Sequence, residues 1–321
     1  MVRTNLTKDV GEDTQTLENI VCVTGWKDDI NNHLMIIATT NIFLSFLAFL
    51  GNTLILVALS KESSLHPPAK LLYRCLAITD LCVGLISEPS SVVYWLSLVR
   101  EDWKLCHHAL KMSFLSYYIL SLVSLLTMTA ISVDRLLALL LGQRFGHAVT
   151  LKRTCVIVVI IWAFSITAGI SHFINYRVAG WCSYGVVSLC IKTATLSYIK
   201  IFCALRQNHV RGQVFFPPQP GKPVPLNMIR YRKAVNSALW VQLALIVCYL
   251  PYSIATGLFQ SQNELSSLEF VVLESTVTLV YLNSSLNPFL YCWKIAEVRK
   301  AVKETISKAL SSLLGYSIQN N

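Results

Sequence analysis

The stretch that decides the fold class is residues 34–60, LMIIATTNIFLSFLAFLGNTLILVALS, which contain no charged side chain. About 20 apolar residues in a helix are enough to cross the roughly 30 Å hydrocarbon core of a bilayer. Irregular backbone is too costly in lipid because its polar groups find no water there, so such a segment should be an α-helix. We therefore predict a transmembrane helix over residues 34–60.

Further apolar runs of this kind follow along the chain. The predicted spans are about 34–60, 69–97, 107–139, 153–174, 183–206, 233–259 and 268–292. Residues 1–33 form a polar tail before them, and residues 293–321 form an amphipathic helix and a C-terminal tail after them. The basic and apolar faces of that helix suit contact with an anionic membrane surface. The sequence thus predicts an all-α membrane protein, a seven-transmembrane helix bundle with a short amphipathic membrane-surface helix after the last span.

The composition of the whole chain agrees with this fold class. Of its 321 residues, 54% are hydrophobic and 14% are charged, whereas a soluble domain carries about 25% charged residues. The mean hydropathy is +0.54. These values exclude a soluble enzyme, a disordered regulator and a fibrous protein. The sequence also lacks the His-Glu-x-x-His, Gly-x-Ser-x-Gly and glycine-rich phosphate-binding motifs, so we expect no enzyme activity.

The distribution of charge predicts how the bundle is oriented. Lys and Arg are retained on the cytoplasmic side, and most of the 27 basic residues fall on that side when the N-terminus is outside. The N-terminal tail instead holds the acids Asp9, Glu12, Asp13, Glu18, Asp28 and Asp29. We therefore expect a multi-pass plasma-membrane protein with an extracellular N-terminus, a cytoplasmic C-terminus, lipid contacts and no nucleic-acid partner. Asn5, in Asn5-Leu6-Thr7, is a glycosylation candidate on the extracellular side.

Polar residues recur inside the predicted spans, where they are costly and by default functional. One interpretation is a set of interhelical hydrogen bonds that hold the bundle together. Their order along the chain gives a more specific interpretation. The motifs are Gly51-Asn52, Leu76-Ala77-Ile78-Thr79-Asp80, Asp134-Arg135-Leu136, Trp162, Cys248-Tyr249-Leu250-Pro251, Asn287-Pro288-Phe289-Leu290-Tyr291 and Arg299. With these motifs the chain resembles the rhodopsin-like (class A) G-protein-coupled receptors.

A turn between the first two spans narrows this resemblance. Ser64-Leu65-His66-Pro67-Pro68 is most similar to the melanocortin, adenosine and cannabinoid side of the class. An orphan group expanded in an invertebrate lineage is the alternative.

The resemblance implies an activation switch at the inner membrane face. Asp134 would restrain Arg135 in the inactive state, and on activation Arg135 would stack under the C-terminal helix of a Gα subunit. The switch residues that the resemblance implies are Asp134, Arg135, Tyr198, Tyr249, Pro251, Asn287, Pro288 and Tyr291. The implied partners are a heterotrimeric G protein and arrestin. A plain positive-inside pair is the alternative interpretation of Asp134 and Arg135.

The inner end of the sixth span departs from the family pattern. Residues 230–233, Arg-Tyr-Arg-Lys, offer no acid that could pair with Arg135. We therefore expect no ionic lock between the third and sixth spans. Without such a lock, we expect the basal activity to be raised.

The resemblance also implies a sodium site inside the bundle. Its candidate ligands are Asp80, Ser124, Asn283 and Asn287. A carboxylate at mid-membrane depth must be neutralised by a proton or a cation, and hydroxyl and amide oxygens suit Na⁺. The alternative is a protonated Asp80 that only donates hydrogen bonds. We expect no other cofactor or metal.

On the ligand side, Tyr117 stands where amine receptors carry Asp, and Tyr281 stands where opsins carry the retinal Lys. The ligand is therefore expected to be neither a monoamine nor retinal, and its identity as a small molecule or a peptide stays open. The pocket candidates are Glu88, Tyr94, Lys111, Tyr117, Ser121, Tyr249, Tyr252, Glu274 and Tyr281. Glu88 is expected either to receive a cationic ligand group or to pair with Lys111.

The resemblance implies a disulfide between Cys106, at the outer end of the third span, and Cys182. Cys22 is a third candidate for this bond. The connection between the fourth and fifth spans is short, so Cys182 falls at or inside the start of the fifth span. Lys192, near the middle of that span, is expected to reach a polar partner inside the bundle unless the chain is short in this segment.

Two other functions stay open. A receptor-like protein that no longer signals is the first, because Tyr249 replaces the family's hinge Trp, and because the positions of the family's transmission triad hold Leu125, Cys190 and Leu245. A membrane transporter is the second. It would need paired charges or broken helices along a path, whereas few charges lie at mid-membrane depth.

Overall fold

The computed structural model describes residues 21–22, 29–61, 65–174, 176–215, 226–259, 266–294, 298–307 and 311. Asn5 lies outside the described residues. The elements are α2 (Asp29–Lys61), α3 (Pro67–Cys82), η1 (Val83–Ser87), α4 (Glu88–Val99), α5 (Trp103–Leu141), η2 (Gly142–Arg144), α6 (Phe145–Ala148), α7 (Leu151–Ile174), α8 (Tyr176–Phe215), α9 (Leu226–Phe259) and α10 (Ser267–Lys294). Residues 298–307 are helical too. Every regular element in the described ranges is a helix, which confirms the all-α fold class.

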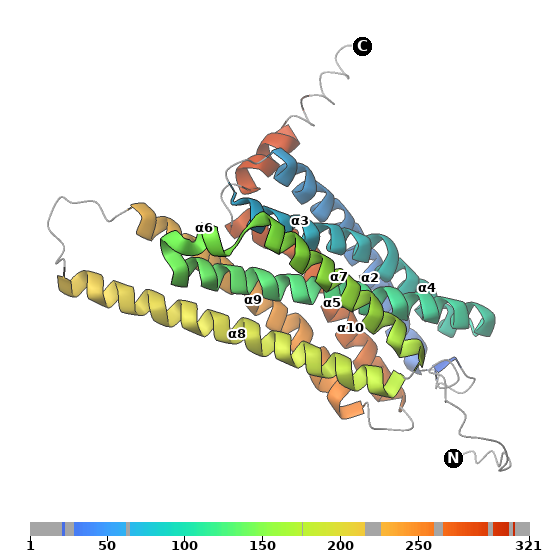
Figure 1. The fold of residues 1–321 in the computed structure, drawn as a ribbon. Coiled ribbons are helices and arrows are strands. Elements are labelled where there is room, and N and C mark those ends of the chain that lie inside the picture. Colours follow the sequence, from blue (N-terminus) through green and yellow to red (C-terminus); the bar gives the residue numbers. More distant parts are fainter. Residues whose placement is uncertain are drawn as a thin grey trace, which may run out of the picture.

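Within the described ranges, seven long helical segments run side by side in one bundle (Figure 1). The elements α3, η1 and α4 together form one of them, and α2, α5, α7, α8, α9 and α10 each form another. Four described stretches are long and apolar enough to cross a membrane: Ile30–Lys61, Trp103–Leu141, Leu151–His172 and Val178–Ala204. Phe43, Val159 and Leu189 are each more than 60% exposed on the outside of these helices, as expected of side chains that face lipid.

The second segment is divided by the π-helical turn η1, which lies between Asp80 and Glu88. Pro89 follows this turn in the first turn of α4. In a regular α-helix a proline ring clashes with the carbonyl group four residues before it, and a π-turn relieves this by taking up one more residue. We therefore attribute the π-turn η1 to Pro89. Because η1 takes up an extra residue, it changes the direction in which Glu88 leaves the helix relative to Asp80.

The first and last spans meet at Gly51 of α2 and Pro288 of α10. A Cβ atom built on Gly51 would lie 2.8 Å from Cγ of Pro288, closer than two carbon atoms can approach without displacement. Next to it, Nδ2 of Asn52 donates a hydrogen bond to the carbonyl oxygen of Ser284 at 3.1 Å. The Gly51-Asn52 motif thus packs directly against the motif that contains Pro288.

Substitution of Gly51 by alanine is expected to destabilise the fold by about 1–3 kcal/mol, because the added methyl group must displace a rigid proline ring. Gly185→Ala in α8 is the matched control. A Cβ atom on Gly185 meets nothing within 4 Å, and alanine is the better helix former. Thermal unfolding in detergent compares the two variants, and a Gly51→Ala protein as stable as the wild type would contradict the close packing.

A disulfide ties the N-terminal segment to the start of α5. It joins Cys22 to Cys106, so the predicted pairing of Cys106 with Cys182 is wrong, and the third candidate is the partner. The physical reason lies in α8. That helix already begins at Tyr176, which leaves Cys182 inside a helix, exposed and with a free thiol.

Candidate functional site

A buried polar cluster surrounds Asp80 of α3. Oδ1 of Asp80 accepts hydrogen bonds from Oγ of Ser124 at 3.3 Å and from Oγ of Ser284 at 2.8 Å. Oδ2 accepts from Nδ2 of Asn287 at 2.7 Å. All four side chains are buried. One carboxyl group therefore connects α3 to α5 and α10 in the interior of the bundle.

The amide oxygens around this cluster fit a cation. Asn283 is fully buried, but its Nδ2 contacts Sδ of Met128 at 3.3 Å and does not hydrogen-bond to Asp80. The Oδ1 atoms of Asn52, Asn283 and Asn287 are buried and have no hydrogen-bond partner among the described residues. Carboxyl, hydroxyl and amide oxygens are the donors that a hard cation prefers, so this residue set fits Na⁺.

The second cluster lies toward the C-terminal end of α5. Nη2 of Arg135 lies 3.2 Å from Oδ2 of Asp134, and the two side chains are 29% and 4% exposed. The guanidinium carbon of Arg135 lies 6.0 Å from the centre of the Tyr73 ring. Tyr73 in turn packs edge-on against Tyr291, with the ring centres 5.2 Å apart. The arginine therefore lies between Asp134 and the Tyr73 ring of α3, and that ring in turn contacts α10.

The two tyrosines of the predicted switch are both buried, Tyr198 in α8 and Tyr291 in α10. The hydroxyl of Tyr291 has no hydrogen-bond partner among the described residues, so the two are not bonded to each other here. Tyr73 is the contact that the sequence analysis missed. It lies seven residues before Asp80 on the same helical face, and that spacing is the signal that could have found it.

Tyr249, the residue at the hinge position of α9, is hydrogen-bonded to α5. The hydroxyl of Tyr249 donates to the carbonyl oxygen of Ser121 at 3.2 Å, and the Tyr249 side chain is buried. Pro251 lies inside α9, and Pro288 lies inside α10. Each proline removes one backbone hydrogen bond and permits a kink. Tyr249 thus lies two residues before Pro251, at the point where α9 can bend.

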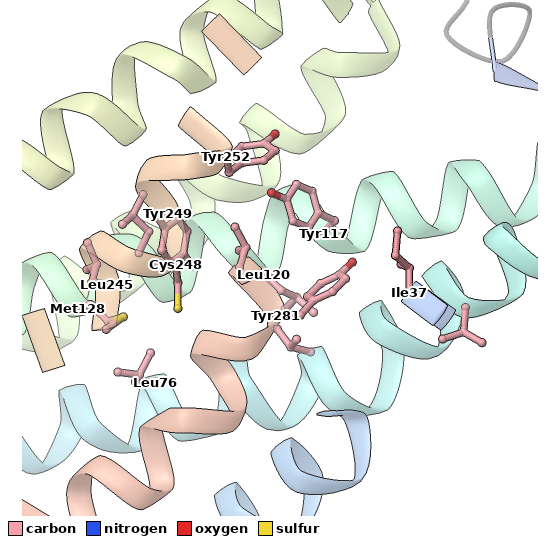
Figure 2. Close-up of a cluster of buried hydrophobic side chains, with 14 of the residues drawn as sticks. Ile37, Leu76, Tyr117, Leu120, Met128, Leu245, Cys248, Tyr249, Tyr252 and Tyr281 are labelled. Atoms are coloured by element: carbon pink, nitrogen blue, oxygen red, sulfur yellow. The ribbon is translucent and has the colours of Figure 1, made fainter. Parts of the chain in front are cut away.

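A small cavity lies beside this hinge, between α5, α7, α8 and α9. Its lining includes Tyr117, Tyr118, Ser121, Ser183, Tyr249 and Tyr252. Tyr117 packs edge-on against both Tyr252 and Tyr281, with ring centres 5.6 Å apart in each pair. Figure 2 shows these three rings gathered between α5, α9 and α10. Four of the predicted pocket residues therefore line one cavity, and Tyr281 contacts its wall.

Comparison with known proteins decides the family. Residues 51–194 and 177–291 match the model of the family described as 7 transmembrane receptor (rhodopsin family). The chain belongs to the rhodopsin-like receptors. Melanocortin receptor 5 of Mus musculus is 28% identical over 279 residues, which cover 82% of each chain. Adenosine receptor A2a of Homo sapiens is 23% identical over 302 residues, which cover 84% of this chain and 71% of the relative. These matches confirm the resemblance to this class and to its melanocortin and adenosine side.

In this receptor the acidic pocket candidates lie apart from the cavity lining. Glu88 is fully buried, and neither of its carboxyl oxygens has a hydrogen-bond partner among the described residues. Lys111 is exposed on α5, so the alternative in which Glu88 pairs with Lys111 is wrong. Glu274 is buried as well and accepts a hydrogen bond from Nε1 of Trp95 at 2.9 Å. Tyr94 is buried with its hydroxyl unpaired among the described residues.

A chain of hydroxyl groups links the tyrosine rings to the neighbourhood of Glu88. The Tyr281 hydroxyl lies 3.1 Å from Oγ of Ser87 and 2.8 Å from Oγ of Ser91. Oγ of Ser91 lies 2.7 Å from Oγ of Ser113 on α5. The sequence analysis missed these serines. The sequence signal that could have identified them is the presence of Ser87 and Ser91 on either side of Glu88 in the second predicted span.

His172 of α7 is a further residue that the sequence analysis missed. Its ring stacks on Tyr118 with the ring centres 3.6 Å apart, and its Nδ1 lies 3.2 Å from the carbonyl oxygen of Ala168. Tyr118 and Ala168 both line the cavity, so His172 supports the cavity wall. A histidine in an otherwise apolar span was the signal for it.

Proposed function

We propose that the receptor binds an extracellular ligand and activates heterotrimeric G proteins through an outward swing of the inner half of α9 about Pro251. Its N-terminus would be extracellular and its C-terminus cytoplasmic. The observation that carries this proposal is the half-buried pair of Asp134 and Arg135, 3.2 Å apart and packed against Tyr73. The acid that pairs with this guanidinium is its own neighbour in the sequence, at the edge of the bundle, so the pair can separate without the unfolding of any helix.

The released arginine is the chemical link to the partner. The guanidinium presents five donors in a fixed fork, and the last carbonyl groups of a helix carry unpaired acceptors and partial negative charge. Arg135 would therefore bind the C-terminal helix of a Gα subunit once α9 has moved away. Arrestin would compete for the same opening.

The ligand is proposed to place an apolar or aromatic group in the cavity beside Tyr249. Four tyrosine rings and several aliphatic side chains line the cavity, and aromatic rings pack edge-on or offset against other rings. Glu88 and Glu274 are not in the lining, so a cationic group is not needed to fill this cavity. A ligand that presses on Tyr249 would act directly on the hinge of α9.

The test of this function uses Asp134→Asn, which leaves Arg135 without its anionic partner. Loss of this coupling is expected to raise basal signalling by about 5- to 30-fold, measured as cAMP and calcium output in cells at equal surface level. Asp102→Asn, the same substitution at the exposed N-terminal cap of α5, is the matched control. If Asp134→Asn cells match those without receptor in both outputs, the alternative of a receptor-like protein that no longer signals is favoured.

We also propose that Asp80, Ser124, Asn283 and Asn287, with Ser284, hold a sodium ion. Replacement of NaCl by choline chloride is then expected to lower the unfolding temperature of the purified wild type by about 2–5 °C. Asp80→Asn is expected to remove this difference because it removes the anionic ligand. Glu88→Gln, a buried acid outside the cluster, should keep it. A wild type that unfolds at the same temperature in both salts would favour a protonated Asp80 that only donates hydrogen bonds, and a sodium effect that persists in Asp80→Asn would mean that sodium binds elsewhere.

A further inference from the structure

Lys192 lies in the middle of the apolar part of α8. That part runs from Val178 to Ala204. At a rise of 1.5 Å per residue, Lys192 is about 21 Å along the helix axis from Val178 and about 18 Å from Ala204. A lysine side chain spans at most about a third of either distance, so its ammonium group stops short of both ends of the span.

The side chain of Lys192 faces outward. It is exposed, and along the same helical face Leu189, Leu196 and Ile199 are 65%, 58% and 52% exposed. The expectation that Lys192 reaches a polar partner inside the bundle is therefore wrong: it forms no hydrogen bond or ion pair with any other described residue. Figure 1 shows α8 along an edge of the bundle.

A lipid-facing ammonium group is costly, and charged groups within membranes pair with a group of opposite charge. The described spans supply no such group at the depth of Lys192. Asp80, Glu88, Asp134 and Glu274 are buried within the bundle, and Glu269, in the first turn of α10, accepts hydrogen bonds from Ser266. A second copy of the chain would therefore bring another Lys192 to this face but no carboxylate.

We infer that this face of α8 docks a transmembrane helix of a different protein that carries Asp or Glu at mid-bilayer depth. Gly185, seven residues before Lys192, lies on the same face, and a Cβ atom there would meet nothing within 4 Å. Small residues let the backbones of two membrane helices approach closely. The face thus offers a point of close approach, a leucine-rich surface and one unpaired positive charge for the partner.

The experiment measures energy transfer between labelled receptor and a synthetic leucine-rich spanning peptide in lipid vesicles. The peptide carries Glu, Gln or Leu at its centre. The wild type is expected to bind the Glu peptide about 3- to 30-fold more tightly than the Gln peptide. Lys192→Leu should lose this preference, and Lys192→Glu should instead prefer a peptide with a central Lys. Lys200→Leu, which removes an exposed lysine nearer the inner end of α8, should keep the wild-type preference.

Two results would overturn the inference. The first is a wild type that does not distinguish the Glu peptide from the Gln peptide, which would mean that Lys192 is neutral or is solvated by a membrane defect. The second is a loss of receptor self-association in Lys192→Leu with no change in peptide binding, which would make a second copy the occupant of this face. A melting temperature of Lys192→Leu equal to or above that of the wild type verifies that the variant is folded.

Discussion

Serine in place of Cys106 is expected to lower the free energy of unfolding by about 2–5 kcal/mol. The bond between Cys22 and Cys106 closes a loop across a sequence separation of 84 residues, and a disulfide that closes a long loop removes more chain entropy from the unfolded state. The bond also ties Cys22 to the first turn of α5. We expect the variant to reach the cell surface in reduced amounts.

Serine variants of the three candidate cysteines distinguish the Cys22–Cys106 bond from the Cys106–Cys182 bond that the sequence predicted. Cys22→Ser should match Cys106→Ser in unfolding temperature, and the double variant should be no less stable than either single one, because all three lack the same bond. Cys182→Ser is the matched control and should behave as the wild type, since its thiol is free and exposed. A Cys182→Ser protein as unstable as Cys106→Ser would show that these two residues pair.

Alanine in place of Arg135 is expected to abolish G-protein signalling. The effect is best seen in the Asp134→Asn background, where basal signalling is raised and no ligand is needed. The double variant should fall to the output of cells without receptor, because the group that binds the Gα helix is gone. Arg135→Lys should recover only part of the signal, since an ammonium group lacks the planar fork of the guanidinium.

The control for this loss is Arg153→Ala in the same background. Arg153 donates to the carbonyl oxygen of Ala148, the last residue of α6, at 2.7 Å and forms no ion pair with Asp134, so its removal should leave signalling largely intact. Surface expression of each variant is measured by antibody labelling. Equal signalling by the Arg135→Ala and Arg153→Ala double variants would rule out Arg135 as the coupling residue.

The helical fold could be predicted because lipid leaves the backbone few choices. A long apolar run such as residues 34–60 can only be a helix in a bilayer, and α2 covers it. The motif residues could be predicted in part for a similar reason. A buried carboxyl group such as Asp80 must find partners, and two of the three residues that bond to it, Ser124 and Asn287, were named from the sequence alone.

The remaining features depend on side-chain direction, which spacing does not determine. Cys182 could not be excluded as a disulfide partner without the start of α8, which places it inside a helix. Lys192 was expected to point inward because a lipid-facing charge is costly, yet the rotation of α8 turns it outward. Asn283 carries the right chemistry for the sodium cluster, but its amide nitrogen contacts Met128. Tyr73 belongs to no motif, and only its ring contacts with Arg135 and Tyr291 assign it to the switch.

The most direct measurement is the rate of nucleotide exchange on purified heterotrimeric G proteins with receptor in lipid nanodiscs. Wild type, Asp134→Asn and Asp134→Asn/Arg135→Ala are compared without any ligand. We expect Asp134→Asn to accelerate exchange on at least one G protein about 5- to 30-fold over the wild type, and the double variant to return to the rate without receptor. Exchange that no variant accelerates, or that the double variant accelerates as much as Asp134→Asn does, would show that Arg135 does not couple this receptor to G proteins.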